Sequence, residues 1–333
     1  MVSEQRHGCG PARLLGMAGR ALRFGHSPGG NEMTRQELNA HRHPSEAGLF
    51  WLTMIVIVPV CLAAILFAFE SFTMALVVVT SIVVSTWILM KMLTARFLGN
   101  CVKVSEENFS EIHAAIREFQ DLFDYHTEID AYVYEQSTYN ALLLPLLRRK
   151  FILLNSDVLA NAGPENEVRW LVARFVGGLA SKHYRFAWLQ VIISSIEKII
   201  IFNLLLYPYE RAVVKSGDQL GLLAIDGDLE SAVAAVQKTM VGGALGEHIN
   251  LAGLLSQEEA IGGSFFAWLV KCMSPFPHAT SRLVNLLRYA GQRHPLQLEA
   301  FLAHEEEATR QRVRRAIGHA GPADIVEPLE APA

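Results

Sequence analysis

Two long runs of apolar residues without a charge dominate the pattern of hydrophobic and polar positions. The first run covers Leu49–Phe69 and the second covers Met74–Met90, with Glu70–Thr73 between them. A helix needs about 20 apolar residues to cross the hydrocarbon core of a bilayer. The pattern therefore predicts a transmembrane helical hairpin over residues 46–95.

The charges that flank the two runs predict their orientation. Lysines and arginines lie before the first run and after the second, whereas the turn between them carries only Glu70. Basic flanks stay on the cytoplasmic side, so we expect a multi-pass protein of the cell inner membrane with a cytoplasmic main domain. A third apolar stretch, Trp188–Tyr207, contains Glu197 and Lys198. It leaves two interpretations open, a partly buried or membrane-surface helix and a further span.

A different periodicity appears in Val168–His183, which follows Pro164 and Glu165. Proline and an acidic residue both suit the first turn of a helix. Apolar residues then recur at steps of three and four, which predicts one buried helical stripe. The stripe consists of Val168, Leu171, Val172, Phe175, Val176 and Leu179.

Two short segments favour strands instead. Ile129–Tyr134 alternates apolar and polar positions, and Phe151–Leu154 is rich in β-branched, aromatic and aliphatic residues. Such composition is typical of strands. Together with the helical stripe, these segments predict an α+β domain with a small sheet.

Several blocks of residues 99–290 resemble, in order, the membrane zinc endopeptidases typified by HtpX and the CAAX prenyl endopeptidase. The blocks include the two expected strands, the helix with its Lys182-His183 tail, the run Asp218–Gly221, and a closing segment, Ser274–Arg282. The resemblance implies a mainly helical, zincin-like fold with a small sheet. Two alternatives stay open, an accidental likeness and an alignment that hides the true ligands.

The family binds zinc through an HExxH helix and a glutamate from a second helix, and the HExxH glutamate activates the bound water. Carried over, the resemblance places Arg174 at the first histidine, Phe175 at the glutamate, Gly178 at the second histidine and Val214 at the third ligand. Arginine has no lone pair for a metal, and the other three side chains have no donor atom. The resemblance therefore implies a pseudopeptidase without a cofactor, and the alternative is an active zinc metalloendopeptidase with unrecognised ligands.

The resemblance also marks four remnants of the family's motifs, namely Asn140, His183, Arg211 and Asp218. In such peptidases the aspartate that corresponds to Asp218 orients the first histidine. We therefore expect Arg174 to pair with Asp218 through charge-assisted hydrogen bonds. The alternative is that Arg174 extends from the polar side of its helix to water.

Composition narrows the range of partners. The chain has 333 residues, of which 51% are hydrophobic and 19% charged, and its formal net charge is -4. It lacks the basic footprint of a nucleic-acid-binding protein. The expected partners are the lipid bilayer and either a membrane protein or an active paralogous peptidase. The remaining parts are expected to be a disordered arm over residues 1–45 and a helix end with a loose tail over residues 291–333.

Overall fold

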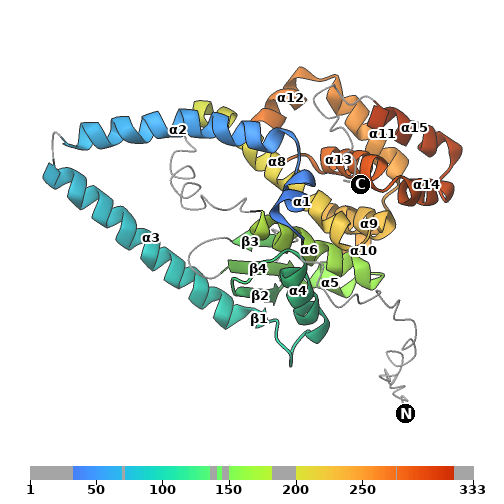
Figure 1. Cartoon of the computed structure of the whole chain (residues 1–333), viewed down its shortest axis with the longest axis horizontal. Helices are drawn as coiled ribbons and strands as arrows, with labels where there is room; N and C mark the ends of the chain where they lie inside the picture. The colour runs from blue at the N-terminus through green and yellow to red at the C-terminus, as the bar shows by residue number, and fades with distance from the viewer. Residues whose placement is uncertain are drawn as a thin grey trace, which may run out of the picture. The chain divides into compact units, whose positions relative to one another are not determined.

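The computed structural model describes residues 33–69, 72–135, 141–144, 150–181, 200–274 and 276–318. These residues belong to one compact unit that begins at Met33. Most of them are helical, and one small sheet packs against the helices (Figure 1). The predictions for Asn140, for His183 and for residues 1–32, 188–199 and 319–333 concern residues outside this described part of the chain.

The sheet has four strands in the order β1-β2-β4-β3. These are β1 Val102–Lys103, β2 Ile129–Tyr134, β3 Ala141–Leu144 and β4 Lys150–Asn155. Strands β2 and β4 pair in parallel, whereas β1 on β2 and β3 on β4 are antiparallel. Both predicted strands are therefore confirmed.

Side chains of β2 and β4 alternate between the two faces of the sheet, as strand geometry requires. Ala131, Val133, Ile152 and Leu154 belong to the main hydrophobic core, which the helices share. Tyr132, Phe151 and Leu153 form a smaller cluster on the other face.

The helices are described in chain order, which the colours of Figure 1 follow from blue to red. The N-terminal helices are α1 Arg35–Ala40, α2 Ser45–Phe69, α3 Phe72–Asn100 and α4 Ser110–Leu122. The central helices are α5 Ser156–Ala160, α6 Glu165–Ala180, α8 Ile200–Ala224, α9 Leu229–Val241 and α10 Gly243–Gly246. The C-terminal helices are α11 Leu251–Gly262, α12 Phe265–Cys272, α13 Ala279–Arg293, α14 Pro295–Ala303 and α15 Glu307–Gly318.

Helix α6 is the predicted periodic helix, and it lies at the centre of the core. It begins after Pro164, and its apolar stripe is buried apart from Val168, which is half-buried. Trp170, which the stripe did not include, is also fully buried. The helix packs against α4, α8 and α9, so it joins the sheet side of the domain to the C-terminal helices.

The structure corrects the expected transmembrane hairpin. Among the residues that it describes, no helix combines enough length with enough apolar character to cross a membrane. The fold class that included this hairpin, and the multi-pass location in the inner membrane, are therefore wrong. What remains is a mostly helical fold with a small sheet.

Packing of α2 on α8 gives the physical reason. Glu46 is 1% exposed and accepts a hydrogen bond from Ser216 of α8 at 2.5 Å. The ring of Phe50 lies 5.7 Å from that of Tyr209, and Thr53 is buried. The first turns of α2 thus belong to the folded domain, which leaves a segment shorter than the roughly 20 residues of a span. Helix α3 contains the second apolar run and continues through Lys91 and Arg96.

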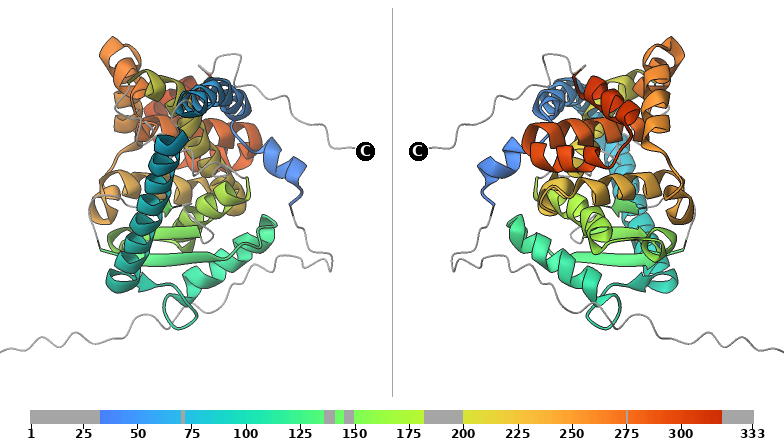
Figure 2. Two further views of the ribbon diagram at one scale, coloured as in Figure 1. Left: turned by 90° about the vertical axis from the view of Figure 1, so that its left-hand side faces the viewer. Right: turned by 90° about the vertical axis from the view of Figure 1, so that its right-hand side faces the viewer.

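Helices also occupy parts of both predicted tails. Helix α1 begins with a capping box between Thr34 and Glu37, which satisfies backbone donors at its start. At the other end, α14 and α15 pack on α13 (Figure 2). Leu298, Leu302 and Val313 enter the main core, so the folded domain extends to Gly318.

Candidate functional site

Helices α6 and α8 approach each other closely because α8 carries glycines at the contact. A Cβ atom on Gly221 would lie 2.9 Å from Nε1 of Trp170 and 3.1 Å from Cβ of Arg174. A Cβ atom on Gly217 would lie 3.2 Å from the carbonyl oxygen of Arg174. The missing side chains therefore let the two backbones come together at the middle of α6.

These contacts show that the two helices run antiparallel where they meet. Moving along α6 from Trp170 to Arg174 corresponds to moving back along α8 from Gly221 to Gly217. Arg174, the position that the resemblance assigns to the first histidine, therefore lies at this helix–helix contact.

Asp218 is the polar centre of this contact. Nη2 of Arg174 lies 3.1 Å from Oδ1 of Asp218, and the Asp218 side chain is 0% exposed. The predicted pair is therefore confirmed. Arg174 itself is 11% exposed, so the alternative in which it extends to water is wrong.

A second arginine, which the sequence did not reveal, holds the same carboxylate. Nε of Arg282 donates to Oδ2 of Asp218 at 2.8 Å, and Nη2 donates to Oδ1 at 3.0 Å. This two-point geometry is the strongest arrangement between arginine and a carboxylate. Arg282 lies on α13, in the segment that carried the resemblance, but no local pattern tied it to Asp218.

Aromatic rings complete the surroundings of Arg174. Its guanidinium carbon lies 5.2 Å from the ring centre of Trp170 and 5.1 Å from that of Phe175. A cation over the face of an aromatic ring is attracted by the ring quadrupole. The guanidinium is thus positioned by a carboxylate and by two rings.

The positions carried over from the zinc peptidases do not fit a zinc ion. Phe175 and Gly178 are buried, Val214 is half-buried, and none has a donor atom for a metal. Across the described ranges, no three His, Cys, Asp or Glu side chains come together as metal ligands. Because a metal can be bound elsewhere, the absence of a cofactor stays a prediction.

Arg211, one of the four motif remnants, makes a structural contact with the end of α12. Its Nη1 donates to the carbonyl oxygens of Lys271 at 2.7 Å and Ser274 at 3.0 Å. These carbonyls lie at the end of α12, where a cation complements the helix dipole. Burial lowers the pKa of Arg211. The contact therefore fixes the C-terminus of α12 to α8.

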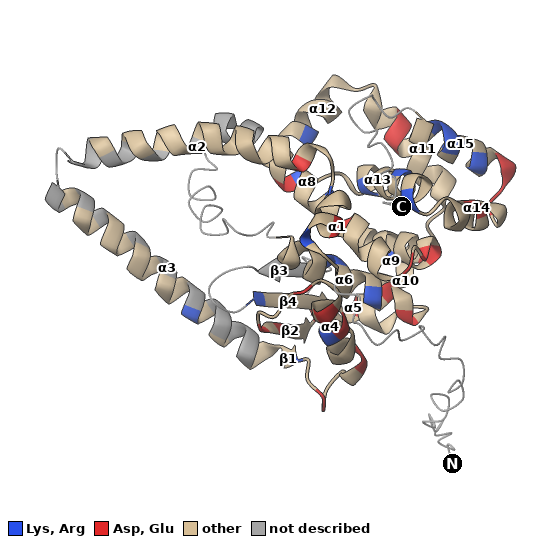
Figure 3. Ribbon diagram, in the orientation of Figure 1, with Lys and Arg blue, Asp and Glu red and all other residues tan. Residues whose placement is uncertain are grey.

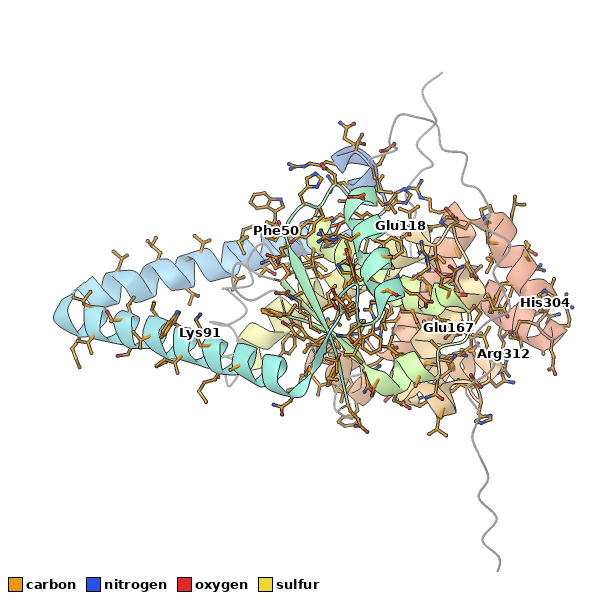
Figure 4. The ribbon with its side chains drawn as sticks, turned by 90° about the horizontal axis from the view of Figure 1, so that it is seen from below. Phe50, Lys91, Glu118, Glu167, His304 and Arg312 are labelled. Carbon is orange, nitrogen blue, oxygen red and sulfur yellow. The ribbon has the colours of Figure 1, made fainter. Side chains whose placement is uncertain are left out.

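A second buried ion pair holds the start of α6. Nζ of Lys238 lies 2.8 Å from Oε2 of Glu167 and donates to the carbonyl oxygen of Asn161 at 2.8 Å. The same Glu167 oxygen accepts from the backbone N–H of Gly163 at 3.1 Å. Glu167 is labelled in Figure 4. These bonds attach the loop before α6 to α9, and they place α6 for its contact with α8.

Comparison of the chain with protein-family models, with curated proteins and with solved structures finds no match. The comparisons therefore neither support nor exclude the resemblance to zinc endopeptidases.

Proposed function

We propose that this protein is a metal-free, peptidase-like scaffold of the HtpX type, which binds a partner and does not cleave it. The observation that carries the proposal is the contact between Arg174 and Asp218. The resemblance assigns these residues to the first zinc ligand and to the aspartate that orients it, and their atoms lie 3.1 Å apart. This contact supports the proposal, because the resemblance predicts that these two residues, which are far apart in the sequence, pair with each other.

The charge of Arg174 explains how such a site can dispense with a metal. A buried carboxylate without a cation is costly. In a zinc site the histidine and the metal offset this cost, whereas here the guanidinium groups of Arg174 and Arg282 neutralise Asp218 directly. We propose that the fixed cation of Arg174 takes the structural role of the zinc charge.

The proposed partner is a protein with an apolar surface, either a membrane protein or an active paralogous peptidase. Helix α12 supports this choice, since none of its side chains is buried. Phe265, Phe266 and Trp268 are 66%, 75% and 54% exposed. Figure 3 shows few charges on α12, whereas the neighbouring α11 and α15 carry several. Large exposed apolar side chains that cluster in this way are typical of interaction sites.

Restoring the ligand set tests the assignment of the positions. The variant combines Arg174→His, Phe175→Glu, Gly178→His and Val214→Glu. We expect it to bind about one zinc ion per chain, since two histidines one turn apart and a facing glutamate form a catalytic zinc site. A variant that folds and binds no zinc would show that the positions do not correspond.

The wild-type chain tests the absence of catalysis. We expect purified protein to carry no stoichiometric zinc and to show no chelator-sensitive cleavage of casein. Chelator-sensitive cleavage that is lost on Arg174→Ala would establish the alternative, an active metallopeptidase.

For the partner, binding of the paralogous peptidase should weaken when Phe266 and Trp268 are both changed to serine. Equal binding to protein-free lipid vesicles would instead identify the bilayer as the partner.

A further inference from the structure

We propose that the segment around α1 is an acid-released strap, which leaves α13 when His41 gains a proton. The strap is the segment Met33–His41, and it lies on the outside of the domain (Figure 2). Its helix has only six residues, which is too short to be stable alone in water. The contacts that the strap makes with other elements therefore decide whether it stays helical and docked. The proposal goes beyond the proposed function and does not depend on it.

The first part of the strap is held by one backbone bond and one apolar side chain. The backbone N–H of Met33 donates to the carbonyl oxygen of Leu122, at the end of α4, at 3.1 Å. Leu38 is 5% exposed and belongs to the main hydrophobic core. Neither contact involves a group that titrates near neutral pH.

The end of the strap is held by polar contacts with α13. Nδ1 of His41 lies 2.7 Å from the hydroxyl oxygen of Tyr289, and the two rings meet edge to face. Nη2 of Arg293 donates to the carbonyl oxygen of Ala40 at 3.3 Å. The histidine thus lies at the junction of the strap with α13, next to a fixed positive charge.

A turn directly after His41 can act as a hinge. It contains Pro44 and leads into α2. The chain beyond the turn has anchors of its own, because the backbone N–H of His43 donates to Oγ of Ser216 at 2.9 Å, and Ser216 also bonds to Glu46. The strap can therefore leave α13 while the start of α2 stays on α8.

The surroundings of His41 oppose a positive charge on its ring. Burial, and then the charges of Arg293 and His294, lower the pKa of His41 from 6.5 to about 4. Glu37 acts in the opposite direction, but its carboxylate already accepts from the hydroxyl of Thr34 at 2.8 Å. A proton on His41 therefore places two cations side by side at the end of the strap, and release of the strap separates them.

None of the other charged groups described near this junction offsets the new charge. Arg42 and Glu46, at the start of α2, form an ion pair with each other. Asp226 acts on His294, whose pKa is lowered by burial. Burial also raises the pKa of Tyr289, so its hydroxyl stays neutral and supplies no negative charge.

Hydrogen exchange followed by mass spectrometry tests the release in the full-length protein. With a pKa of about 4 in the docked state and 6.5 in the released state, the released population should be about 50-fold larger at about pH 4.5 than at about pH 7. After correction for intrinsic exchange rates, protection of the strap's helical amides should fall by this factor. It should also stay below the protection of α9 at both pH values, because the opening is local. No fall in protection, or equal protection of the strap and α9 at about pH 4.5, would overturn the proposal.

Two substitutions of the same residue separate charge from packing. His41→Gln keeps a polar side chain that does not titrate, and should reduce the 50-fold change to a few-fold at most. His41→Lys carries a positive charge at both pH values, and should expose the strap to exchange already at about pH 7 while α9 stays protected.

The matched control is His126→Gln, since the His126 side chain is 75% exposed and lies outside the strap. It should keep the full change of the wild-type protein. A wild-type change in His41→Gln, or wild-type protection of the strap in His41→Lys at about pH 7, would show that the charge of His41 does not release the strap.

Discussion

The carboxylate of Asp218 joins Arg174 to Arg282, with Oδ1 lying 3.1 Å from Nη2 of Arg174 and 3.0 Å from Nη2 of Arg282. The three residues come from α6, α8 and α13, so one buried acceptor connects three helices. Asp218 is fully buried and both arginines are nearly so. The arrangement therefore depends far more on the carboxylate than on either cation alone.

The first prediction follows from this asymmetry. Asp218→Ala leaves two arginines facing each other in the interior, and we expect it to lower the free energy of unfolding by about 3–5 kcal/mol. Arg174→Met should cost less, because Arg282 still pairs with Asp218 through two hydrogen bonds. Urea unfolding followed by circular dichroism measures both values.

The control for this prediction is Asp121→Ala, which removes an exposed aspartate from α4. It should change the free energy of unfolding by no more than about 0.5 kcal/mol. If Asp218→Ala were as mild as this control, the carboxylate would not hold the three helices together.

The local elements could be predicted from the sequence because their patterns are local. The stripe of α6 and the alternation in β2 record which face of each element is buried. The pair of Arg174 and Asp218 was predictable only through the resemblance, which supplied the alignment of α6 with α8. Arg282 could not be found in this way, since nothing near it in the sequence encodes the distance between α13 and Asp218.

The apolar run of α2 shows where a hydropathy pattern fails. The pattern measures the absence of charge, but it does not show which turns of a helix pack on the rest of the protein. Glu46 and Phe50 pack the start of α2 against α8. Their partners on α8, Ser216 and Tyr209, are distant in the sequence. A hydropathy average over neighbouring residues therefore cannot detect this packing.

The second prediction concerns the close contact of α6 and α8. Gly221→Ala places a methyl group 2.9 Å from Nε1 of Trp170, which is fully buried, so a neighbouring atom must shift to accommodate it. We expect this change to lower the free energy of unfolding by about 1–3 kcal/mol.

The matched control is Gly253→Ala on α11, where a Cβ atom meets nothing within 4 Å. Higher helix propensity should stabilise this control by up to about 1 kcal/mol. Equal effects of the two changes in chemical unfolding would argue against the close contact.

The third prediction concerns the buried pair of Glu167 and Lys238. Lys238→Met leaves the Glu167 carboxylate in the interior without its cation, and should lower the free energy of unfolding by about 3–5 kcal/mol. Adding Glu167→Gln to this variant should recover part of the loss, because a neutral amide costs less to bury than a charge. A double-mutant cycle measures the coupling, and purely additive losses would show that the two side chains do not interact.

The last prediction is a dependence of stability on pH that comes from His41. Burial first, and then the positive charges of Arg293 and His294, lower its pKa from 6.5 to about 4, although Glu37 opposes the shift. Between these two values the unfolded chain binds more protons than the folded chain, so stability falls as the pH falls through this window. Burial also lowers the pKa of His294, which adds to the same trend. His41→Gln should therefore flatten the loss of unfolding free energy between about pH 6.5 and 4, and leave its pH dependence above about 6.5 unchanged.

His126→Gln is the control, since the His126 side chain is 75% exposed. Urea unfolding at about pH 4.5, 5.5 and 7.5 compares the three proteins, and an equally steep loss in His41→Gln would show that His41 is not the group responsible.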